Sequence, residues 1–578
     1  MQKNATYIWK IGAPAGFGVM TIGLSISKLA ARSGYHIFDY SEYPSLIRGG
    51  HNTYEVAISG QPVHSTKQPV DFLICFDQQT STLHESRLHA ESVLMYDPGV
   101  FDPITVAQKV PVPFQGLLNE LKADKIMVNM IGLGASFALM GGKEELLIEL
   151  INDQFARKGR EIVEANNTCA RTGYNYITQH HPHVIKSILA FRPDQPAQVV
   201  LAGNDAFSLG AVAADCRFYA AYPMSPSSSV LETLAAWQRT TGMVVRHAED
   251  EIGVANEALG ASFAGVRSAT GSSGGGFALM AETLSYAGIA ELPLVVFVAQ
   301  RPGPATGMPT WTEQGDLLFS VFAGHGEFPK IVLAPGDPAE MIDQTMKAFD
   351  LADIYQTPVI VLSDKMLSES HLNVPEEDMA ALMNRPINRG KTIPITTPTQ
   401  HPYERYALSE DGISPRLIPG SGSAWYQANS YEHLADSHTT EDMAERVAQV
   451  KKRSQKIETY LKQDFAAPTV YGDIEEADSI LFSWGGNKGA ILDAVQELRS
   501  TGKNVCFLHF THLYPLSPKI LSPYFSHHKP YIQIENNGTG QFGQLLKMAI
   551  GFETPHKLLK CDGRPIFREE VVATVQGI

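Results

Sequence analysis

Three successive acids open a segment that is otherwise poor in charge. Glu249, Asp250 and Glu251 precede IGVANEALGASFAG, whose residues are mostly small or apolar. Acids in the first turn of a helix are ordinary partners of the helix dipole, which is one interpretation. The other is that an acid at the start of a buried helix lies in a crevice, where carboxyl groups with functional roles gather.

Two polar stretches follow strand-like runs. ELPLVVFVAQ (291–300) is almost continuously apolar, as is typical of a strand buried on both faces, and Arg301 follows it directly. AAYPMSPSSSVLE (220–232) places hydroxyl groups, Ser225 among them, between prolines and a helix start. Ligands in open α/β sheets bind at the carboxyl ends of strands, so both stretches are candidate sites for an anionic or polar ligand.

Three further segments allow more than one interpretation. Arg48 precedes a glycine pair and offers a bidentate fork for carboxylate or phosphate, although a solvated loop arginine is the simpler explanation. The turn GAPAGFG (12–18) departs from GxGxxG, which leaves nicotinamide binding, another phosphate or acyl-carrier contact, or a structural turn. SATGSSGGGFALM (268–280) takes glycine and serine into a helix and permits close backbone approach.

The elements that must position these residues recur three times as a strand, a glycine turn and a helix. The chain has 578 residues, enough for about three to five domains. The openings lie near residues 12, 203 and 485, and we expect the first to begin a parallel sheet and QTPVIVLSD (356–364) to close the second. The fold class predicted is α/β, in several domains.

A long connector is predicted before the third unit. Residues 385–435 are rich in Gly, Ser and Pro and show few periodic segments. A helix over 440–463 follows, with Thr439 as a possible N-cap. Its predicted apolar face consists of Met443, Val447, Val450, Ile457 and Leu461.

Composition narrows the possible partners. Hydrophobic residues make up 44% and charged residues 19%, and the net charge is −15. Such an acidic chain is a poor candidate for binding nucleic acid or an anionic membrane. No apolar run reaches the roughly 18–20 residues of a membrane span, and the first residues lack the layout of a signal peptide. We expect a soluble cytoplasmic protein with no nucleic-acid or membrane partner.

The number and spacing of the cysteines argue against disulfide, zinc and iron–sulfur sites in this chain. No two are spaced as a CxxC pair and their number is odd, which argues against a disulfide framework, a zinc ribbon and an iron–sulfur cluster held by this chain alone. They are Cys75, Cys169, Cys216, Cys506 and Cys561.

Together, these segments resemble the α subunit of 2-oxoacid:ferredoxin oxidoreductases in the form with the γ domain fused at its N-terminus. The motifs are YPMSPSSS, EDEIG, TGSSGGGFALM, RPGPATGMPT with TEQGDL, ERYALSEDGISPRLIPG, SWGGNKGAILDAVQEL and ENNGTGQFGQLL. RPGPATGMPT and EDGISPR favour the 2-oxoglutarate branch. The resemblance implies a γ-type α/β domain (1–190), a thiamine diphosphate pyrimidine-binding α/β domain (191–385), a connector (386–470) and a transketolase-C-like α/β domain (471–578).

The family's cofactors and partners follow from the same resemblance. It implies thiamine diphosphate shared with a β subunit, Mg²⁺ and [4Fe–4S] on that subunit, coenzyme A as a substrate, ferredoxin as acceptor and an (αβ)₂ assembly. The chain has no cluster-spaced cysteines and no convincing GDG…N motif for diphosphate and metal. Both absences fit an α subunit that needs its β partner for turnover.

The resemblance also gives roles to single residues. It implies that Glu251 is the acid bonded to N1′ of the thiamine pyrimidine, with Tyr222 and Pro223 also at the cofactor. Ser225 and Arg301 are expected to contact the 2-oxoacid. Arg48 is assigned to a distal substrate carboxylate on its charge and placement.

The reaction implied for the 2-oxoglutarate branch is oxidative decarboxylation to succinyl-CoA, with electrons passed to ferredoxin. Alternatives are the same chemistry on pyruvate or a branched-chain 2-oxoacid, a non-catalytic scaffold, and, remotely, an NAD-linked dehydrogenase.

Overall fold

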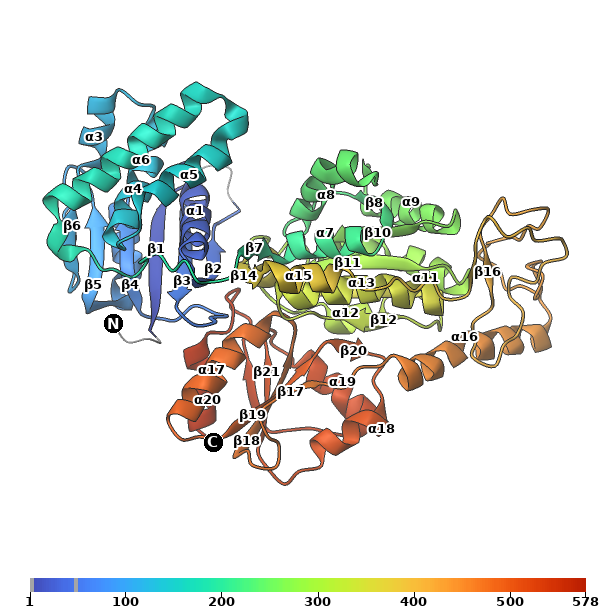
Figure 1. Cartoon of the computed structure of the whole chain (residues 1–578). Coiled ribbons are helices and arrows are strands. Elements are labelled where there is room, and N and C mark those ends of the chain that lie inside the picture. Colours follow the sequence, from blue (N-terminus) through green and yellow to red (C-terminus); the bar gives the residue numbers. More distant parts are fainter. Residues whose placement is uncertain (1–4, 46–49) are drawn as a thin grey trace. The chain divides into compact units, whose positions relative to one another are not determined.

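The computed structural model describes residues 5–45 and 50–578 (Figure 1). They form two compact units. The first comprises residues up to Leu201 with the short segments Glu369–Asp378 and Phe567–Ala573, and the second comprises the remainder. None of the helices among the described residues is long and apolar enough to cross a membrane.

An eight-stranded mixed sheet forms the centre of the first unit, in the order β6-β5-β4-β1-β3-β2-β14-β7. Its strands are β1 (Thr6–Pro14), β2 (His36–Glu42), β3 (His51–Ser59), β4 (Val70–Cys75), β5 (Leu88–Tyr96), β6 (Gln108–Pro111), β7 (Gln198–Ala202) and β14 (His371–Pro375). The prediction that the chain begins with a parallel sheet is wrong at this point. Strand β3 inserts between β1 and β2 and runs antiparallel to both, while β1 is parallel to β4.

Six helices complete the first unit: α1 (Val19–Arg32), α2 (Gln78–His84), α3 (Phe114–Leu121), α4 (Val128–Leu139), α5 (Glu144–Phe155) and α6 (Arg160–His180). Helix α4 is buried along its whole length. A Cβ on its Gly134 would lie 1.8 Å from the Ala170 carbonyl of α6, and one on Gly173 would lie 1.9 Å from the Ile131 carbonyl. These two glycines therefore let the α4 and α6 backbones meet directly.

A parallel sheet organises the second unit, in the order β20-β12-β13-β11-β10-β8-β9. Its strands are β8 (Cys216–Ala221), β9 (Val244–His247), β10 (Arg267–Ser272), β11 (Leu294–Gln300), β12 (Ile331–Leu333), β13 (Pro358–Asp364) and β20 (His512–Tyr514). Only β20 is antiparallel to its neighbour. Strand β7, expected to open this unit, belongs to the first sheet instead.

The segments between these strands form the helices of the second unit. They are α7 (Gly203–Ala213), α8 (Ser228–Thr241), α9 (Glu251–Phe263), α10 (Gly274–Leu279), α11 (Ala281–Ile289), α12 (Leu317–Phe322) and α13 (Pro338–Tyr355), followed by α14 (Lys365–Glu369) and α15 (Glu376–Met383) at the return to β14. The apolar strands β11 and β13 are buried along their whole length, as predicted for both.

The connector contains little regular structure before α16 (Met443–Gln463), only the short strands β15 (Thr392–Ile393) and β16 (Arg416–Leu417). Asp442, not Thr439, caps α16, because its carboxylate accepts the amides of Ala444 and Glu445 at 2.8 and 3.0 Å.

The predicted apolar face of α16 is also wrong, since Met443 is 80% exposed and Val447 51%. The face that is buried is polar: Gln449, Lys452, Arg453, Lys456, Thr459 and Tyr460. The reason is Glu291, fully buried after α11, which forms ion pairs of 2.6 Å with both Lys452 and Lys456.

The last part of the chain forms a third, five-stranded sheet in the order β17-β19-β18-β21-β22. Its strands are β17 (Thr469–Tyr471), β18 (Ser479–Trp484), β19 (Val505–Phe510), β21 (Tyr531–Glu535) and β22 (His556–Leu559), and its helices are α17 (Lys488–Ser500), α18 (Pro518–Leu521) and α19 (Gln541–Ile550). The last helix, α20 (Arg568–Gln576), begins within the segment Phe567–Ala573 of the first unit. The strand, glycine turn and helix predicted after residue 479 are β18 and α17.

Candidate active site

Four neighbouring parallel strands end at one edge of the second sheet. Tyr222–Ser225 follow β8, Glu251 begins the helix after β9, Ser272 ends β10, and Arg301 follows β11. Because β9, β8, β10 and β11 are adjacent and parallel, their carboxyl ends collect these residues. This is the expected position of a ligand in an open α/β sheet.

The three acids before α9 differ in what they do. Glu249 is exposed. Asp250 is the N-cap, and its Oδ1 accepts the Gly253 amide at 2.7 Å. Glu251 is only 3% exposed. The dipole interpretation therefore describes Asp250, and the crevice interpretation describes Glu251.

The Glu251 carboxylate lies in a narrow polar slot. Its Oε1 accepts a hydrogen bond of 3.3 Å from the Ser272 hydroxyl. A Cβ on Gly276 would lie 2.4 Å from Oε1 and 2.1 Å from Ser272 Oγ, so no larger residue fits there. Across residues 5–45 and 50–578, Glu251 forms no ion pair. A buried carboxyl without a cation suits a ligand with which it can share a proton, and the aminopyrimidine of thiamine fits that description.

Arg301 and Ser225 lie together beside this slot. Arg301 Nη1 donates to the Ser225 carbonyl at 2.6 Å, and Ser225 itself is exposed. Burial lowers the pKa of Arg301 and the negative charge of Asp316 opposes that shift, so the guanidinium remains a cation at neutral pH. Met224 connects the two groups of residues, because its Sδ lies 3.7 Å from Ser272 Oγ.

For the remaining predicted site residues, the structure shows no hydrogen bond or ion pair with Glu251 or Arg301 among the described residues. Tyr222 and Pro223 are exposed at the end of β8, and the centroid of the Tyr222 ring lies 6.1 Å from that of the His247 ring on β9. Arg48 lies outside the described residues.

One acid of the site was given no role by sequence reasoning. Asp316, in TEQGDL, has a carboxylate that lies 2.3 and 2.7 Å from the position that a Cβ would take on Gly274. Burial raises the pKa of Asp316 to about 6, although the Arg301 charge lowers it. Its position after a Pro/Gly loop and before the apolar LLFSVF is the available sequence signal.

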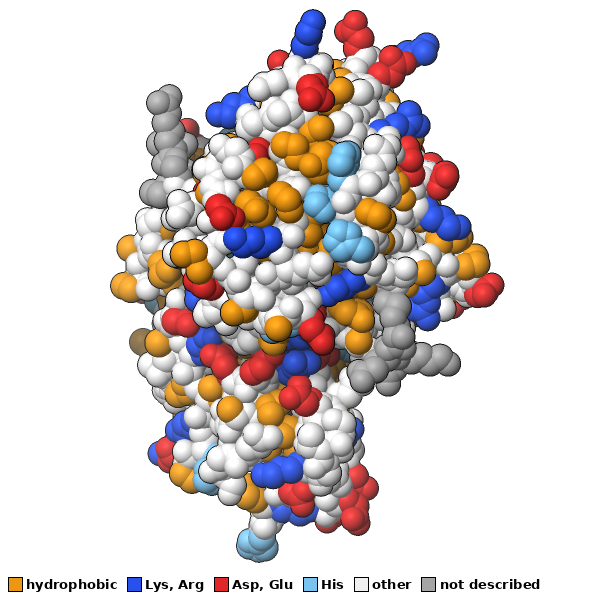
Figure 2. Space-filling model, turned by 90° about the vertical axis from the view of Figure 1, so that its left-hand side faces the viewer, with side chains coloured by type: hydrophobic (Ala, Val, Ile, Leu, Met, Phe, Trp, Pro, Cys, Tyr) orange, Lys and Arg blue, Asp and Glu red, His pale blue; other side chains and the backbone are white. Residues whose placement is uncertain are grey.

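The first unit has a hollow at the GAPAGFG turn. Its volume is about 250 Å³, and its lining is Ala15, Gly16, Phe17, Lys125 and Ile126. Histidine side chains gather among hydrophobic ones on the face shown in Figure 2.

In the part of the chain that the structure describes, no three His, Cys, Asp or Glu side chains are grouped to hold a metal ion.

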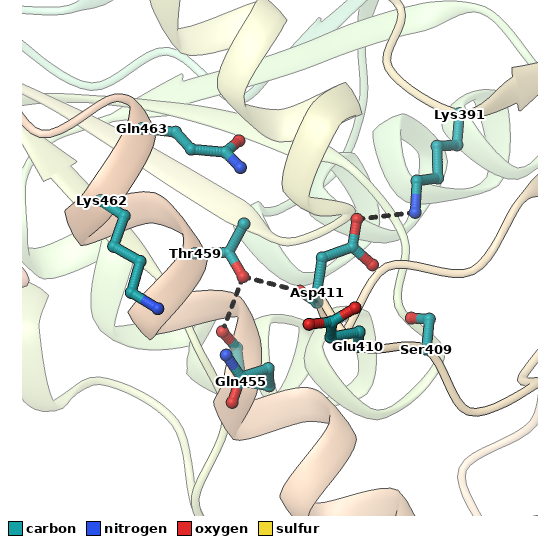
Figure 3. Close-up of a pocket in the computed structure, with 8 residues that line it drawn as sticks. All are labelled: Lys391, Ser409, Glu410, Asp411, Gln455, Thr459, Lys462 and Gln463. Carbon is teal, nitrogen blue, oxygen red and sulfur yellow. Dashed lines mark hydrogen bonds and ion pairs between the residues drawn. The ribbon is translucent and has the colours of Figure 1, made fainter.

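A second hollow lies between the connector and α16 (Figure 3). It has a volume of about 490 Å³ and contains an ion pair of 2.6 Å between Lys391 and Asp411. Thr459 donates to the Asp411 carbonyl at 2.9 Å. None of the predicted site residues lines it.

The site falls within a recognised thiamine-binding region. Residues 209–452 match the family described as "Pyruvate flavodoxin/ferredoxin oxidoreductase, thiamine diP-bdg", and residues 8–176 match "Pyruvate ferredoxin/flavodoxin oxidoreductase". The 2-oxoacid:ferredoxin oxidoreductase subunit alpha of Saccharolobus solfataricus is 31% identical, over 99% of this chain and 97% of its own length. The chain belongs to the family of 2-oxoacid:ferredoxin oxidoreductase α subunits. The resemblance noted in the sequence is thereby confirmed.

Other members of this family are named for one substrate. The 2-oxoglutarate oxidoreductase subunit KorA of Mycobacterium tuberculosis is 31% identical over 94% of this chain and 87% of its own length. The solved 2-oxoglutarate:ferredoxin oxidoreductase from Magnetococcus marinus, with 2-oxoglutarate, coenzyme A and succinyl-CoA bound, superimposes with a TM-score of 0.91. It is 30% identical and covers 99% of each chain. This chain thus has the α/β fold and the thiamine-diphosphate-binding domain of these oxidoreductases.

Proposed function

We propose that this chain is the catalytic α subunit, with a fused γ domain, of a 2-oxoglutarate:ferredoxin oxidoreductase. The reaction is the coenzyme A-dependent oxidative decarboxylation of 2-oxoglutarate to succinyl-CoA and CO₂, with electrons passed to ferredoxin. The observation that carries the proposal is the similarity, over the whole chain, to the solved enzyme with these compounds bound.

Glu251 is the residue that we assign to the cofactor. Thiamine diphosphate, when bound, supplies a carbon nucleophile and an electron sink. The buried Glu251 carboxyl would form a hydrogen bond with a ring nitrogen of the aminopyrimidine, while the Ser272 hydroxyl donates to its Oε1. The burial of Glu251 away from water strengthens that bond. The exposed Tyr222 and Pro223 line the same cofactor.

Arg301 and Ser225 are the residues that we assign to the substrate. The permanent charge of Arg301 binds the carboxylate next to the keto group, in a bidentate geometry that a lysine lacks. The hydrogen bond to the Ser225 carbonyl fixes the guanidinium and leaves its other donors for the substrate. Arg48 is the proposed partner of the distal carboxylate.

A β subunit completes the active site in this proposal. It supplies the contacts to the diphosphate, the Mg²⁺ and the [4Fe–4S] cluster, in an (αβ)₂ complex that works in the cytoplasm. The name of the Saccharolobus relative as a subunit α supports a multi-subunit enzyme. The division into domains at residues 1–190, 191–385, 386–470 and 471–578 stays a prediction.

Two other functions remain alternatives. Both matched families are named for pyruvate, which favours the same chemistry on pyruvate or a branched-chain 2-oxoacid as the second candidate. A non-catalytic scaffold is disfavoured, because Glu251 and Arg301 lie at one sheet edge in an arrangement that a scaffold does not need.

The test is co-expression with the neighbouring β-type subunit and an anaerobic assay of viologen or ferredoxin reduction. Coenzyme A is supplied with 2-oxoglutarate, pyruvate or 2-oxoisovalerate in separate reactions. We expect the highest kcat/KM with 2-oxoglutarate. A preference for another 2-oxoacid would keep the chemistry and reject the role of Arg48. No turnover from a complex loaded with cluster and thiamine diphosphate would favour the scaffold.

A further inference from the structure

A loop follows β11, and its two ends meet at the carboxyl end of that strand. It comprises residues 301–316, from Arg301 to the residue before α12. At its far end, the Asp316 amide donates to Oε1 of Gln300, the last residue of β11, at 2.9 Å. Gln300 is fully buried, and its Nε2 donates to the Ser363 carbonyl of β13 at 3.0 Å. Compact loops whose ends lie close together often carry function.

The tip of this loop lies beside the glycine run that borders the Glu251 slot. Residues 303–308 are exposed. A Cβ on Gly275 would lie 3.8 Å from the Ala305 carbonyl oxygen and 4.0 Å from Met224 Sδ. The next glycine along the chain is the one that packs against the Glu251 carboxylate. The loop therefore begins at the proposed substrate arginine and extends toward the proposed cofactor acid.

The second half of the loop is bound to the third sheet. The Thr312 amide donates to the Gly563 carbonyl at 2.9 Å, and the Gln314 amide donates to the Asn536 carbonyl at 2.7 Å. Nδ2 of Asn537 donates to the Gln314 carbonyl at 3.1 Å. These partners follow the strands β21 and β22. The C-terminal part of the chain thus holds a loop that belongs to the second sheet.

The Gln314 side chain is the centre of this attachment, and it is fully buried. Its Oε1 accepts Nδ2 of Asn487 at 2.6 Å and the Asn536 amide at 3.3 Å. Its Nε2 donates to the Trp484 carbonyl at 3.2 Å and to the Asp364 carboxylate at 3.4 Å. A glutamine amide offers two donor hydrogens and two acceptor lone pairs, and these four bonds use them all. Buried networks whose members are all satisfied favour a single geometry.

Asp364 connects this network to the strand next to β11. It is the last residue of β13 and lies in register with Gln300. Its Oδ1 accepts the Thr312 hydroxyl at 3.2 Å, while its Oδ2 accepts Nε2 of Gln314. The loop is therefore fastened to the edge of its own sheet and to the third sheet through the same two residues.

We propose that Gln314 is the positioning residue that fixes the loop 301–316, and that it thereby holds Arg301 in place for the carboxylate of the 2-oxoacid. This rests on the proposed function, in which Arg301 binds that carboxylate. Bidentate binding by a guanidinium requires a fixed orientation. The bond to the Ser225 carbonyl holds the end of the Arg301 side chain, and the fastened loop holds the backbone from which that side chain departs.

The experiment measures KM and kcat for 2-oxoglutarate in the αβ complex. For Gln314→Ala we expect KM to rise about five- to twentyfold and kcat to change less than about threefold, because a misplaced arginine weakens substrate binding. A residue that serves only the fold would lower the amount of active complex and leave KM unchanged. Asn487→Ala should raise KM about threefold or more. The combined variant should have the KM of Gln314→Ala alone, since both changes remove the same hydrogen bond.

Gln449→Ala is the matched control. Gln449 is also fully buried, and its Nε2 donates to the Tyr406 carbonyl at 2.9 Å, between α16 and the connector. We expect a lower Tm and a native KM, because this glutamine holds a part of the fold that contains none of the proposed site residues.

Hydrogen exchange of the αβ complex gives a readout apart from activity. The amides of residues 309–316 should exchange about tenfold faster or more in Gln314→Ala, and at the native rate in Gln449→Ala. Any of four results would overturn the proposal: a native KM in Gln314→Ala, an equal rise of KM in Gln449→Ala, multiplied effects in the combined variant, or unchanged exchange. If Gln314→Ala does not fold, Asn487→Ala decides by the same measurements. If the native complex turns over no 2-oxoacid, the proposed function fails, and exchange still shows whether Gln314 fixes the loop.

Discussion

Two buried glutamates in the second unit are surrounded in opposite ways. Glu291 is fully buried and has ion pairs to Lys452 and Lys456, and its backbone carbonyl accepts a bond of 2.7 Å from Arg405. Glu251 is almost as buried, and its one side-chain hydrogen bond to the described residues comes from the Ser272 hydroxyl. Burial acts to raise the pKa of Glu291, but Lys456 and Lys452 outweigh it and hold the pKa well below its usual range.

The difference separates an acid that holds the fold together from the acid that we propose to bind the cofactor. The cations around Glu291 fasten the connector and α16 to the loop after α11, and they neutralise its charge. Glu251, at the carboxyl ends of four strands, has one side-chain hydrogen bond and no ion pair within the described residues. A buried charge without a partner costs folding free energy, so its retention indicates a ligand or a reaction.

Glu251→Gln should show the largest effect. We expect kcat to fall by about 10²–10⁴-fold, because an amide cannot exchange a proton with the cofactor ring. Tm should stay the same or rise, since an unpaired buried charge is removed. Steady-state viologen reduction and thermal unfolding check both parts. Glu249→Gln, at the exposed neighbouring acid, is the control and should change neither; equal losses in the two variants would contradict the assignment.

Glu291→Gln should produce the converse pattern. It leaves two lysines buried without their anion, and should lower the free energy of unfolding by about 3–5 kcal/mol. Chemical denaturation measures this loss. Activity per folded molecule should remain near the native value, and a specific loss of kcat at unchanged stability would remove the contrast between the two acids.

Gly276→Ala tests the slot around Glu251. The new methyl group would meet Oε1 at 2.4 Å. We expect the displaced carboxyl to lower kcat by about tenfold or more, because positioning errors of an ångström have effects of this size. Gly275→Ala is the matched control, since its Cβ would have no atom nearer than 3.8 Å. Comparable kcat values for the two variants would show that the slot is not tight.

Lys456→Met should have the smallest effect, about 1 kcal/mol in the free energy of unfolding, because the pair of Glu291 and Lys452 remains. Burial lowers the pKa of Lys456 to about 7, against the pull of Glu291. Its protonated form is thus disfavoured in the fold, and that penalty is fully present below about pH 7 and fades as pH rises toward the unfolded value. The free energy of unfolding of Lys456→Met, relative to that of the native chain, should therefore be higher at about pH 6 than at about pH 9. Chemical denaturation of both proteins at each pH measures this difference.

The sequence was sufficient to predict those site residues that directly follow the carboxyl ends of strands. The apolar run that ends at Gln300 predicted β11, and the parallel pairing of β11, β10 and β8 brings Arg301 and Ser225 together. The α/β class and the family followed from motifs. Asp316 was missed because nothing near it in the sequence shows that its carboxylate lies against Gly274, beside the slot of Glu251.

Long-range partners account for the other errors. Spacing alone favoured Met443 and Val447 as the buried face of α16, because nothing near them shows that Glu291 draws Lys452 and Lys456 inward. Strand β7 was assigned to the second unit because its neighbour β14 lies far along the chain. Periodicity describes local structure, and these contacts are not local.

Strand β20 has a consequence for synthesis of the chain. It covers the outer edge of β12, the last parallel strand in its sheet, with residues 512–514. A ribosome delivers β12 long before β20, so the nascent chain presents an open strand edge in the interval. Open edges invite pairing with other chains. The nascent protein is therefore most prone to aggregate in that interval, and chaperones that shield strand edges would act there.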